Sequence, residues 1–137
     1  MTVTQTADIV VVPHVVRPVA PLGVLALYRS EGWWPDRTAL QVDAVLHGAT
    51  AVGAWQSDEL VGFARAVSDG VLRAYVEDVV VLSRLRRSGV GHALLASLMD
   101  QLRPVPVVSL FCAPDLVAFY EASNFRTTKQ VVLHRSG

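Results

Sequence analysis

Apolar residues in this chain gather in short runs that alternate with turn-forming residues, a pattern typical of a sheet with helices packed against it. The richest run, Tyr75–Leu82, consists mainly of β-branched and aromatic residues and predicts a buried strand. Similar runs elsewhere predict further strands. The expected strands are 8–16, 50–55, 60–67, 75–82, 107–111 and 127–134.

Four other segments carry the signals of helices. Val90, Leu94 and Leu98 recur at a spacing of four, which places them on one face of a helix. Pro21 suits the first turn of an earlier helix, and Asp36 is a candidate N-cap for the next one. The expected helices are 21–29, 36–48, 90–103 and a last one that begins at residue 114.

The connections between these elements indicate the topology of the sheet. The strands 50–55, 60–67 and 75–82 follow one another through tight turns, so we expect an antiparallel meander. The strand 107–111 comes after a crossover helix and is expected to run parallel to 75–82. Pro13 indicates that the first strand lies at an edge or breaks there. The sequence thus predicts an α/β fold with a mixed, mostly antiparallel central sheet flanked by helices on both faces.

A basic segment with two glycines lies between the strand 75–82 and the helix that follows it. Free backbone N–H groups and the positive end of the helix dipole make such a helix start an anion site. Glycines let a phosphate approach the backbone, and arginines add charges that pair with phosphate oxygens. We therefore predict a pyrophosphate site formed by Arg86, Arg87, Ser88, Gly89, Val90, Gly91 and the neighbouring His92.

The hexapeptide Arg86–Gly91 resembles the (Gln/Arg)-x-x-Gly-x-(Gly/Ala) signature of the GCN5-related N-acetyltransferase (GNAT) family. The strand before it is similar to the family's fourth strand, and Leu116–Phe125, which contains Phe-Tyr-Glu, is similar to the helix before the family's last strand. The resemblance implies acetyl-CoA as co-substrate, with its pyrophosphate on the loop. Asn124 stands where the family usually has glycine, but asparagine tolerates the left-handed conformation, so we expect the turn to survive.

The resemblance also implies roles for residues on either side of the loop. In the family the pantetheine arm pairs with the backbone of the fourth strand, which implies contacts with Val79, Val80 and Val81. A backbone N–H near Val79 would polarise the thioester carbonyl. A tyrosine in the Phe-Tyr-Glu helix donates a proton to the leaving thiolate, which implies the same role for Tyr120. Without the resemblance, all four side chains would be interpreted as core residues.

Glu77 and Asp78 are adjacent carboxylates inside the apolar strand 75–82. An unpaired buried charge is unfavourable, so such residues point to a cleft or a solvent edge. Alternation would send the two side chains to opposite faces unless a bulge re-aims one of them. At least one of them, with Glu77 narrowly favoured, is a candidate catalytic base for the substrate amine. The other interpretation is an ordinary salt bridge with Arg65 or Arg73.

Trp33, Trp34 and Asp69 are candidates for the pocket that binds the acetyl acceptor. The resemblance implies that the segment joining the first two helices covers the acceptor. Aromatic rings beside carboxylates suit a cationic amine with an apolar body. The alternative, in which both tryptophans only seal a corner between helices, stays open.

Composition narrows the classes of function. With 137 residues, 52% of them hydrophobic, the chain is expected to form one domain over residues 1–137. Twelve basic and twelve acidic residues give no charge signature for nucleic acid, and neither a membrane span nor a secretion signal is expected. A lone cysteine, Cys112, suits a reducing cytoplasm, and the four histidines lack metal-ligand spacing, so no metal is expected.

Together these features predict a cytoplasmic acetyl-CoA-dependent N-acetyltransferase. The expected acceptor is the primary amine of a small molecule, which attacks the thioester directly because no side chain stands out as an acyl-carrying nucleophile. The alternatives are a non-catalytic acyl-CoA-binding module and an enzyme that acetylates proteins or peptides. The resemblance also makes a homodimer an expectation, whereas no motif identifies the acceptor.

Overall fold

The computed structural model describes residues 4–6 and 8–137. The strands are β1 (Thr4–Thr6), β2 (Ile9–Pro13), β3 (Thr50–Gln56), β4 (Glu59–Ser68), β5 (Arg73–Val81) and β6 (Val107–Leu110). The α-helices are α1 (Pro21–Ser30), α2 (Ala39–Leu46), α3 (Val90–Gln101) and α4 (Val117–Glu121). Short 3₁₀ turns lie at Ser83–Leu85 and Pro114–Leu116.

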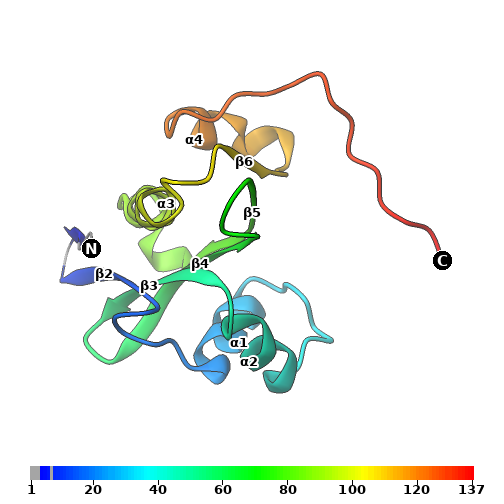
Figure 1. The fold of residues 1–137 in the computed structure, drawn as a ribbon. Helices are drawn as coiled ribbons and strands as arrows, with labels where there is room; N and C mark the ends of the chain where they lie inside the picture. The colour runs from blue at the N-terminus through cyan, green and yellow to red at the C-terminus, as the bar shows by residue number, and fades with distance from the viewer. Residues whose placement is uncertain (1–3, 7) are drawn as a thin grey trace.

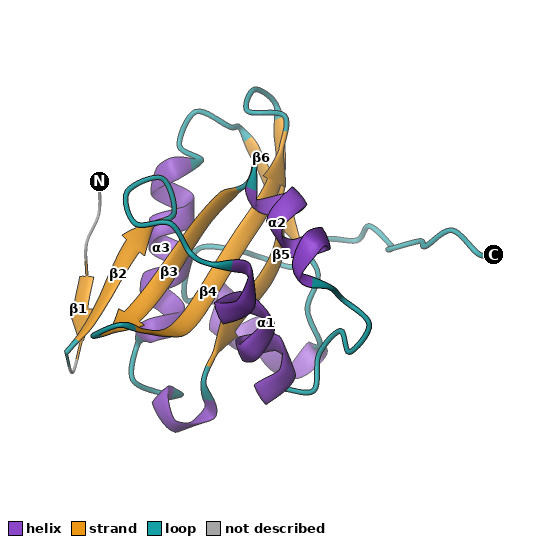
Figure 2. Ribbon diagram, turned by 90° about the horizontal axis from the view of Figure 1, so that it is seen from below, coloured by secondary structure: helices purple, strands orange, loops and turns teal. Residues whose placement is uncertain are grey.

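The strands of the described ranges form one sheet in the order β1-β2-β3-β4-β5-β6 (Figures 1 and 2). Neighbouring strands are antiparallel except β5 and β6, which are parallel because α3 crosses over between them. The predicted meander and the predicted parallel pair are both confirmed. The first predicted strand breaks at Pro13, where β2 ends, and β1 was not predicted because its three residues carry no hydrophobic pattern.

Helices cover both faces of the sheet, as predicted. Figure 1 shows α3 on one face, with α1 and α2 on the other. Leu94 and Leu98 of α3 are fully buried against Val61 of β4, whereas Tyr28 of α1 packs with Phe63 on the opposite face. Each face of the central strands therefore lies in a core, which explains their near-continuous apolar sequences.

The sequence predicted the ends of α1 correctly but not the start of α2. Pro21 begins α1, and Gly32 lies just after its end with a φ of +70°. The prediction that Asp36 caps α2 is wrong. Thr38 is the N-cap, because its hydroxyl accepts the N–H of Gln41 and the Gln41 side chain accepts the N–H of Thr38.

The prediction of a final strand over 127–134 is also wrong. Residues 122–137 contain no strand, and Figure 1 shows this tail leaving α4 and running outward to the C-terminus. The first half of the predicted strand, residues 127–130, is polar and has no apolar face to bury, while Val131 and Leu133 are 79% and 89% exposed. The second edge of β6 consequently pairs with no described strand.

No helix within residues 4–6 and 8–137 has the length and apolar character needed to cross a membrane.

Candidate active site

β5 and β6 separate halfway along β5. Their ladder begins at Arg73 and Val107 and ends at Val76 and Leu110, although β5 continues to Val81. Beyond Val76 the side of β5 that faces β6 has no ladder partner among residues 4–6 and 8–137. Open backbone of this kind can pair with an extended ligand, so the structure leaves this part of β5 available.

The side chains at positions 79–81 pack in the two cores. Val80 is buried with the α1 cluster, whereas Val79 and Val81 pack against the α3 cluster. Their side chains therefore have the structural role that the sequence also allowed. Contacts between their backbone and a pantetheine arm stay a prediction, supported by the open side of β5.

The glycine loop ends where the sequence predicts a helix start. Gly89 has a φ of +90° and is the left-handed N-cap of α3, which begins at Val90. Ala93 N–H donates to the Gly89 carbonyl over 3.0 Å, so the N–H groups of residues 90–92 precede the first helical hydrogen bond. Arg87, with a φ of +64°, is exposed at the entrance to this turn.

The other loop residues make contacts within the protein. Arg86 forms an ion pair with Glu31, at the end of α1, instead of pointing free into solvent. The Ser88 hydroxyl donates to the Leu85 carbonyl and thereby helps to close the turn. A phosphate bound by Arg86 would compete with Glu31 for this guanidinium group.

Gly91 lets α4 pack closely on α3. A Cβ atom added at Gly91 would lie 3.0 Å from Cζ of Phe119, so a larger residue would push this ring away. The Phe119 ring also stacks on His92, with their centroids 4.3 Å apart. His92 is exposed at the same time, and it lies beside the free N–H groups of the helix start.

Tyr120 lies on α4, directly after Phe119. Its ring meets the rings of Phe119 and Phe125 edge-on, with centroids 4.9 and 6.1 Å away. It lines a cavity of about 550 Å³ between β6, α4 and the C-terminal tail. Burial and, to a lesser extent, the Cys112 thiol raise the pKa of the Tyr120 phenol above its ordinary value of 10. The phenol is therefore protonated at neutral pH and can donate a proton.

A β-bulge brings the two adjacent carboxylates to one face of the sheet. In the β4–β5 register Arg65 is opposite Asp78 and Ala66 is opposite Val76, which leaves Glu77 as the extra residue. Both carboxylates reach toward α1 and the segment after it, while the flanking Val76 packs on the α3 face. Strict alternation is thus excluded, and the alternative with a bulge is confirmed.

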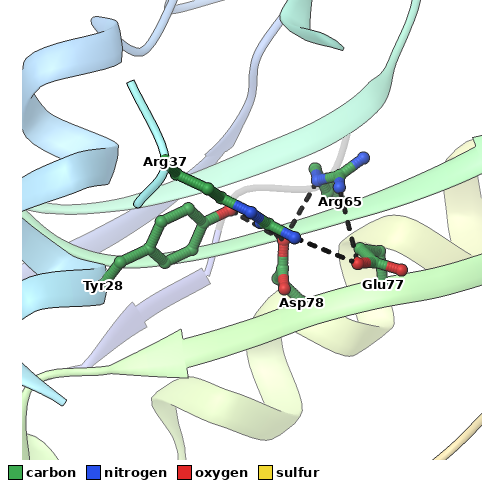
Figure 3. A network of polar contacts seen from close by, with 5 residues as sticks. All are labelled: Tyr28, Arg37, Arg65, Glu77 and Asp78. Atoms are coloured by element: carbon green, nitrogen blue, oxygen red, sulfur yellow. Dashed lines mark hydrogen bonds and ion pairs between the residues drawn. The ribbon is translucent and has the colours of Figure 1, made fainter. Parts of the chain in front are cut away.

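These carboxylates form a network with two arginines and a tyrosine (Figure 3). Oδ2 of Asp78 accepts hydrogen bonds from the Tyr28 hydroxyl at 2.7 Å, Arg65 Nε at 3.0 Å and Arg37 Nη1 at 3.4 Å. Oε1 of Glu77 lies 3.4 Å from Arg37 Nη2 and 3.7 Å from Arg65 Nη2. The predicted salt bridge with Arg65 is therefore present. Burial and the nearby Asp78 carboxylate raise the pKa of Tyr28, which keeps its hydroxyl a donor.

Two members of the network, Arg37 and Tyr28, were not predicted from the sequence. Arg37 is separated from Asp78 by 41 positions and Tyr28 by 50, so no local pattern connects them. The one available signal was an arginine placed three residues after Trp34, in the segment already assigned to the acceptor.

The three predicted acceptor residues lie in two places. Trp34 is at the network, with its ring centroid 4.2 Å from Cζ of Arg37, and Trp33 lies beside it in the same exposed segment. Asp69 lies in the β4–β5 turn, where Oδ1 accepts the N–H groups of residues 71–73. These backbone hydrogen bonds lower the pKa of Asp69 and give it a role in the turn.

Comparisons with known proteins agree with this geometry. Residues 23–125 match the model of the acetyltransferase (GNAT) family. The ycf52 N-acetyltransferase of Porphyra purpurea, itself uncharacterized, is 32% identical over 99 residues, which cover 67% of this chain and 57% of that protein. The chloroplastic serotonin N-acetyltransferase 2 of Oryza sativa subsp. japonica is 40% identical over 67 residues, which cover 47% of this chain and 34% of that protein.

A solved structure extends the likeness to nearly the whole fold. The GNAT-family acetyltransferase SP0256 from Streptococcus pneumoniae TIGR4 superposes with a TM-score of 0.76 and 25% identity, covering 93% of this chain and 99% of that one. This chain belongs to the GNAT family of acetyltransferases, as the sequence resemblance implied. It spans about half the length of the curated relatives that it matches.

Proposed function

We propose that this protein is an acetyl-CoA-dependent N-acetyltransferase that acts on the primary amine of a small molecule by direct attack. The observation that carries the proposal is the course of β5. Its open side lies between a glycine loop with free N–H groups and a bulge that presents two carboxylates. One strand thus connects an anion site to a group that can accept a proton.

The residues present fit acetyl-CoA. Arg87 and the N–H groups of residues 90–92 would hold its pyrophosphate, with Arg86 joining them after it leaves Glu31. The open side of β5 at 79–81 would hold the pantetheine arm. When bound, acetyl-CoA supplies an acetyl group activated as a thioester.

The side chains divide the proton transfers between them. Glu77, whose side chain is 19% exposed against 2% for Asp78, accepts the proton that the amine loses when its nitrogen bonds to the carbonyl carbon. Tyr120 gives its proton to the thiolate that departs as the carbon–sulfur bond breaks. Asp78 positions Tyr28 and Arg65, and the N–H near Val79 polarises the carbonyl.

A small-molecule acceptor is supported by the rice relative, whose name gives serotonin as its substrate. Trp34 beside the carboxylates suits an amine with an aromatic or apolar body. The same relative is named chloroplastic, so the cytoplasmic location of this chain stays a prediction.

Thermal unfolding with acetyl-CoA, followed by an amine panel, tests the proposal. Acetyl-CoA at a hundred times its Kd should add about 2.7 kcal/mol to the free energy of unfolding. Replacing Arg86 and Arg87 together by alanine should reduce this shift, whereas Arg84→Ala, at an exposed arginine paired with Glu59, should not. A wild-type protein that shows no shift would contradict the proposal.

One observation favours a non-catalytic acyl-CoA-binding module as the second candidate. Both carboxylates are already paired with arginines, so neither is free to act as a base in this arrangement. Tyr120→Phe separates the candidates. An enzyme loses most of its turnover while its acetyl-CoA affinity is unchanged, whereas a binding module acetylates nothing with either residue. A peptide panel run beside the amines tests the protein-acetylating alternative.

The expected homodimer is also a proposal. The second edge of β6 pairs with no described strand, and apolar side chains at 131 and 133 of the tail are exposed close to it. Unpaired edges and exposed apolar segments are the features through which chains associate. We propose that two copies meet at this end of the sheet.

A further inference from the structure

We infer that Glu77, Asp78, Trp34 and Tyr28 form a slot for a single positive charge, which Arg37 fills until the charged amine of the acceptor replaces it. This inference rests on the proposed function because it names the class of substrate for the same site. It makes Arg37 a specificity-determining residue. The acceptor class is a monocationic amine with an aromatic or apolar body.

Arg37 is the weakly held member of the network. Its ion pairs with Glu77 and Asp78 are both 3.4 Å long, beyond the 2.7–2.9 Å typical of strong charge-assisted hydrogen bonds. Arg65 instead donates to Asp78 at 3.0 Å from the middle of β4, and its side chain is 9% exposed. Arg37 lies in the segment between α1 and α2, with its side chain 25% exposed. Of the two arginines, Arg37 therefore has the longer contacts, the greater exposure and the place on a connecting segment, which makes it the one that a ligand can displace.

The charges of the slot admit one cation. With Arg37 in place, two carboxylates meet two guanidinium groups and the network is neutral. When Arg37 leaves, Arg65 compensates one carboxylate and one negative charge is left without a partner. A buried carboxylate is stable only when it is paired, so the slot favours a ligand that restores one positive charge.

Aromatic rings flank the position of this charge. Cζ of Arg37 lies 4.2 Å from the ring centroid of Trp34 and 5.4 Å from that of Tyr28. Both distances are within the range at which a cation is attracted to a ring face. An arylalkylamine could place its ammonium group where the guanidinium lies and its apolar part against Trp34, which is 47% exposed. The bound ammonium group must first lose one proton, to water, before its nitrogen can attack, and Glu77, freed by the replacement of Arg37, then accepts the second proton as the nitrogen bonds to the carbonyl carbon.

Calorimetry with 2-phenylethylamine tests the inference without acetyl-CoA, so its outcome is separate from that of the acetyl-CoA experiment. Arg37→Ala should bind this amine about tenfold more tightly than the wild type, because the amine no longer competes with a tethered cation. Neutral 2-phenylethanol, which has a similar shape, should bind Arg37→Ala no more tightly than it binds the wild type. Arg37→Lys retains the competing charge and should bind the amine as the wild type does.

Arg84→Ala is the matched control, since Arg84 is an exposed arginine whose carboxylate partner lies outside the slot. Equal affinity of the amine for wild type and Arg37→Ala would overturn the inference, as would an equal gain for the alcohol. If Arg37→Ala does not fold, Arg37→Gln takes its place, because it removes the charge and keeps a hydrogen-bonding side chain. The amine should then raise the Tm of Arg37→Gln more than that of the wild type, and an equal rise contradicts the slot.

Discussion

Arg86, the first residue of the glycine loop, forms an ion pair with Glu31, at the end of α1. The Glu31 side chain is only 7% exposed, and its other oxygen accepts a hydrogen bond from the Ser83 hydroxyl at 3.2 Å. The segment that begins at Glu31 carries Trp34 and Arg37 to the carboxylates. The glycine loop and the segment between α1 and α2 are therefore in direct contact.

Glu31→Gln should tighten the binding of acetyl-CoA. In the wild type, a phosphate bound by Arg86 competes with the largely buried Glu31 carboxylate for the guanidinium group, and a neutral amide at position 31 weakens this competition. We expect an affinity about fivefold higher, equivalent to about 1 kcal/mol, measured by calorimetry. Glu59→Gln, which removes the partner of exposed Arg84, is the control. An unchanged affinity in Glu31→Gln would show that Arg86 does not bind the phosphates.

Asp78→Ala should destabilise the fold far more than Glu77→Ala. Asp78 is 3% exposed and accepts three hydrogen bonds, so its loss leaves buried Arg65 and the Tyr28 hydroxyl without their acceptor. We expect a loss of about 3–5 kcal/mol in the free energy of unfolding, measured with urea. Glu77→Ala should lose about 1 kcal/mol, since its side chain is closer to solvent. Equal losses of unfolding free energy in the two variants would mean that the buried hydrogen bonds of Asp78 add nothing to the effect of its charge.

Gly91→Ala should disturb α4 although alanine is the better helix former. The gain of up to about 1 kcal/mol in helix propensity is offset by overpacking against Phe119, which costs about 1–3 kcal/mol. Displacement of Phe119 should also move Tyr120, so turnover should fall together with stability. Gly48→Ala is the control, because a Cβ atom there meets nothing within 4 Å. Full turnover in a Gly91→Ala variant would argue against a role for Tyr120 in the reaction.

Stability at high pH should depend on Tyr75. Burial and the Glu77 carboxylate raise the pKa of Tyr75 to about 12, above the ordinary value of 10. The folded protein therefore holds this proton more tightly than the unfolded chain does. Its stabilising contribution is complete below pH ~10 and is lost as the pH rises through about 12. Urea unfolding between pH 8 and 12 should show a smaller decline for Tyr75→Phe than for the wild type, and equal declines would exclude the effect.

Removal of residues 127–137 should abolish the proposed dimer without unfolding the protein. The tail contributes no strand and no buried core residue, so its loss should change the free energy of unfolding little. Light scattering after gel filtration would give the mass of each form. Replacement of Leu133, which is 89% exposed, by aspartate should have the same effect as truncation. A wild-type protein with the mass of one chain would refute the dimer.

The elements that the sequence predicted correctly are those whose signals are local. β5 and α3 follow from an apolar run and from a spacing of four, and the helix start after the glycine loop follows from the place of that loop between them. These elements depend on residues close to one another in the chain. The parallel pairing of β6 with β5 joins distant positions, but it was predictable because a helical crossover permits little else.

Features set by distant contacts were not predictable in the same way. Arg37 reaches Asp78 across 41 positions, and only the packing of α1 and α2 on the sheet brings them together. The bulge at Glu77 depends on the register with β4, which the strand's own sequence leaves open. The prediction of a strand in the tail was wrong although the tail has a local signal. Its apolar residues suit a strand, but no described strand pairs with them.

The bulge makes Glu77 a residue that the sheet could do without. If position 77 were deleted, Val76 and Asp78 would become neighbours in strict alternation, opposite Ala66 and Arg65 as they are now. Every other side chain of β5 would keep its face, and the ladder would be regular. The candidate base thus occupies an insertion that interrupts an otherwise regular strand. A deletion at position 77 would therefore leave the β4–β5 ladder regular while it removes the residue proposed as the base.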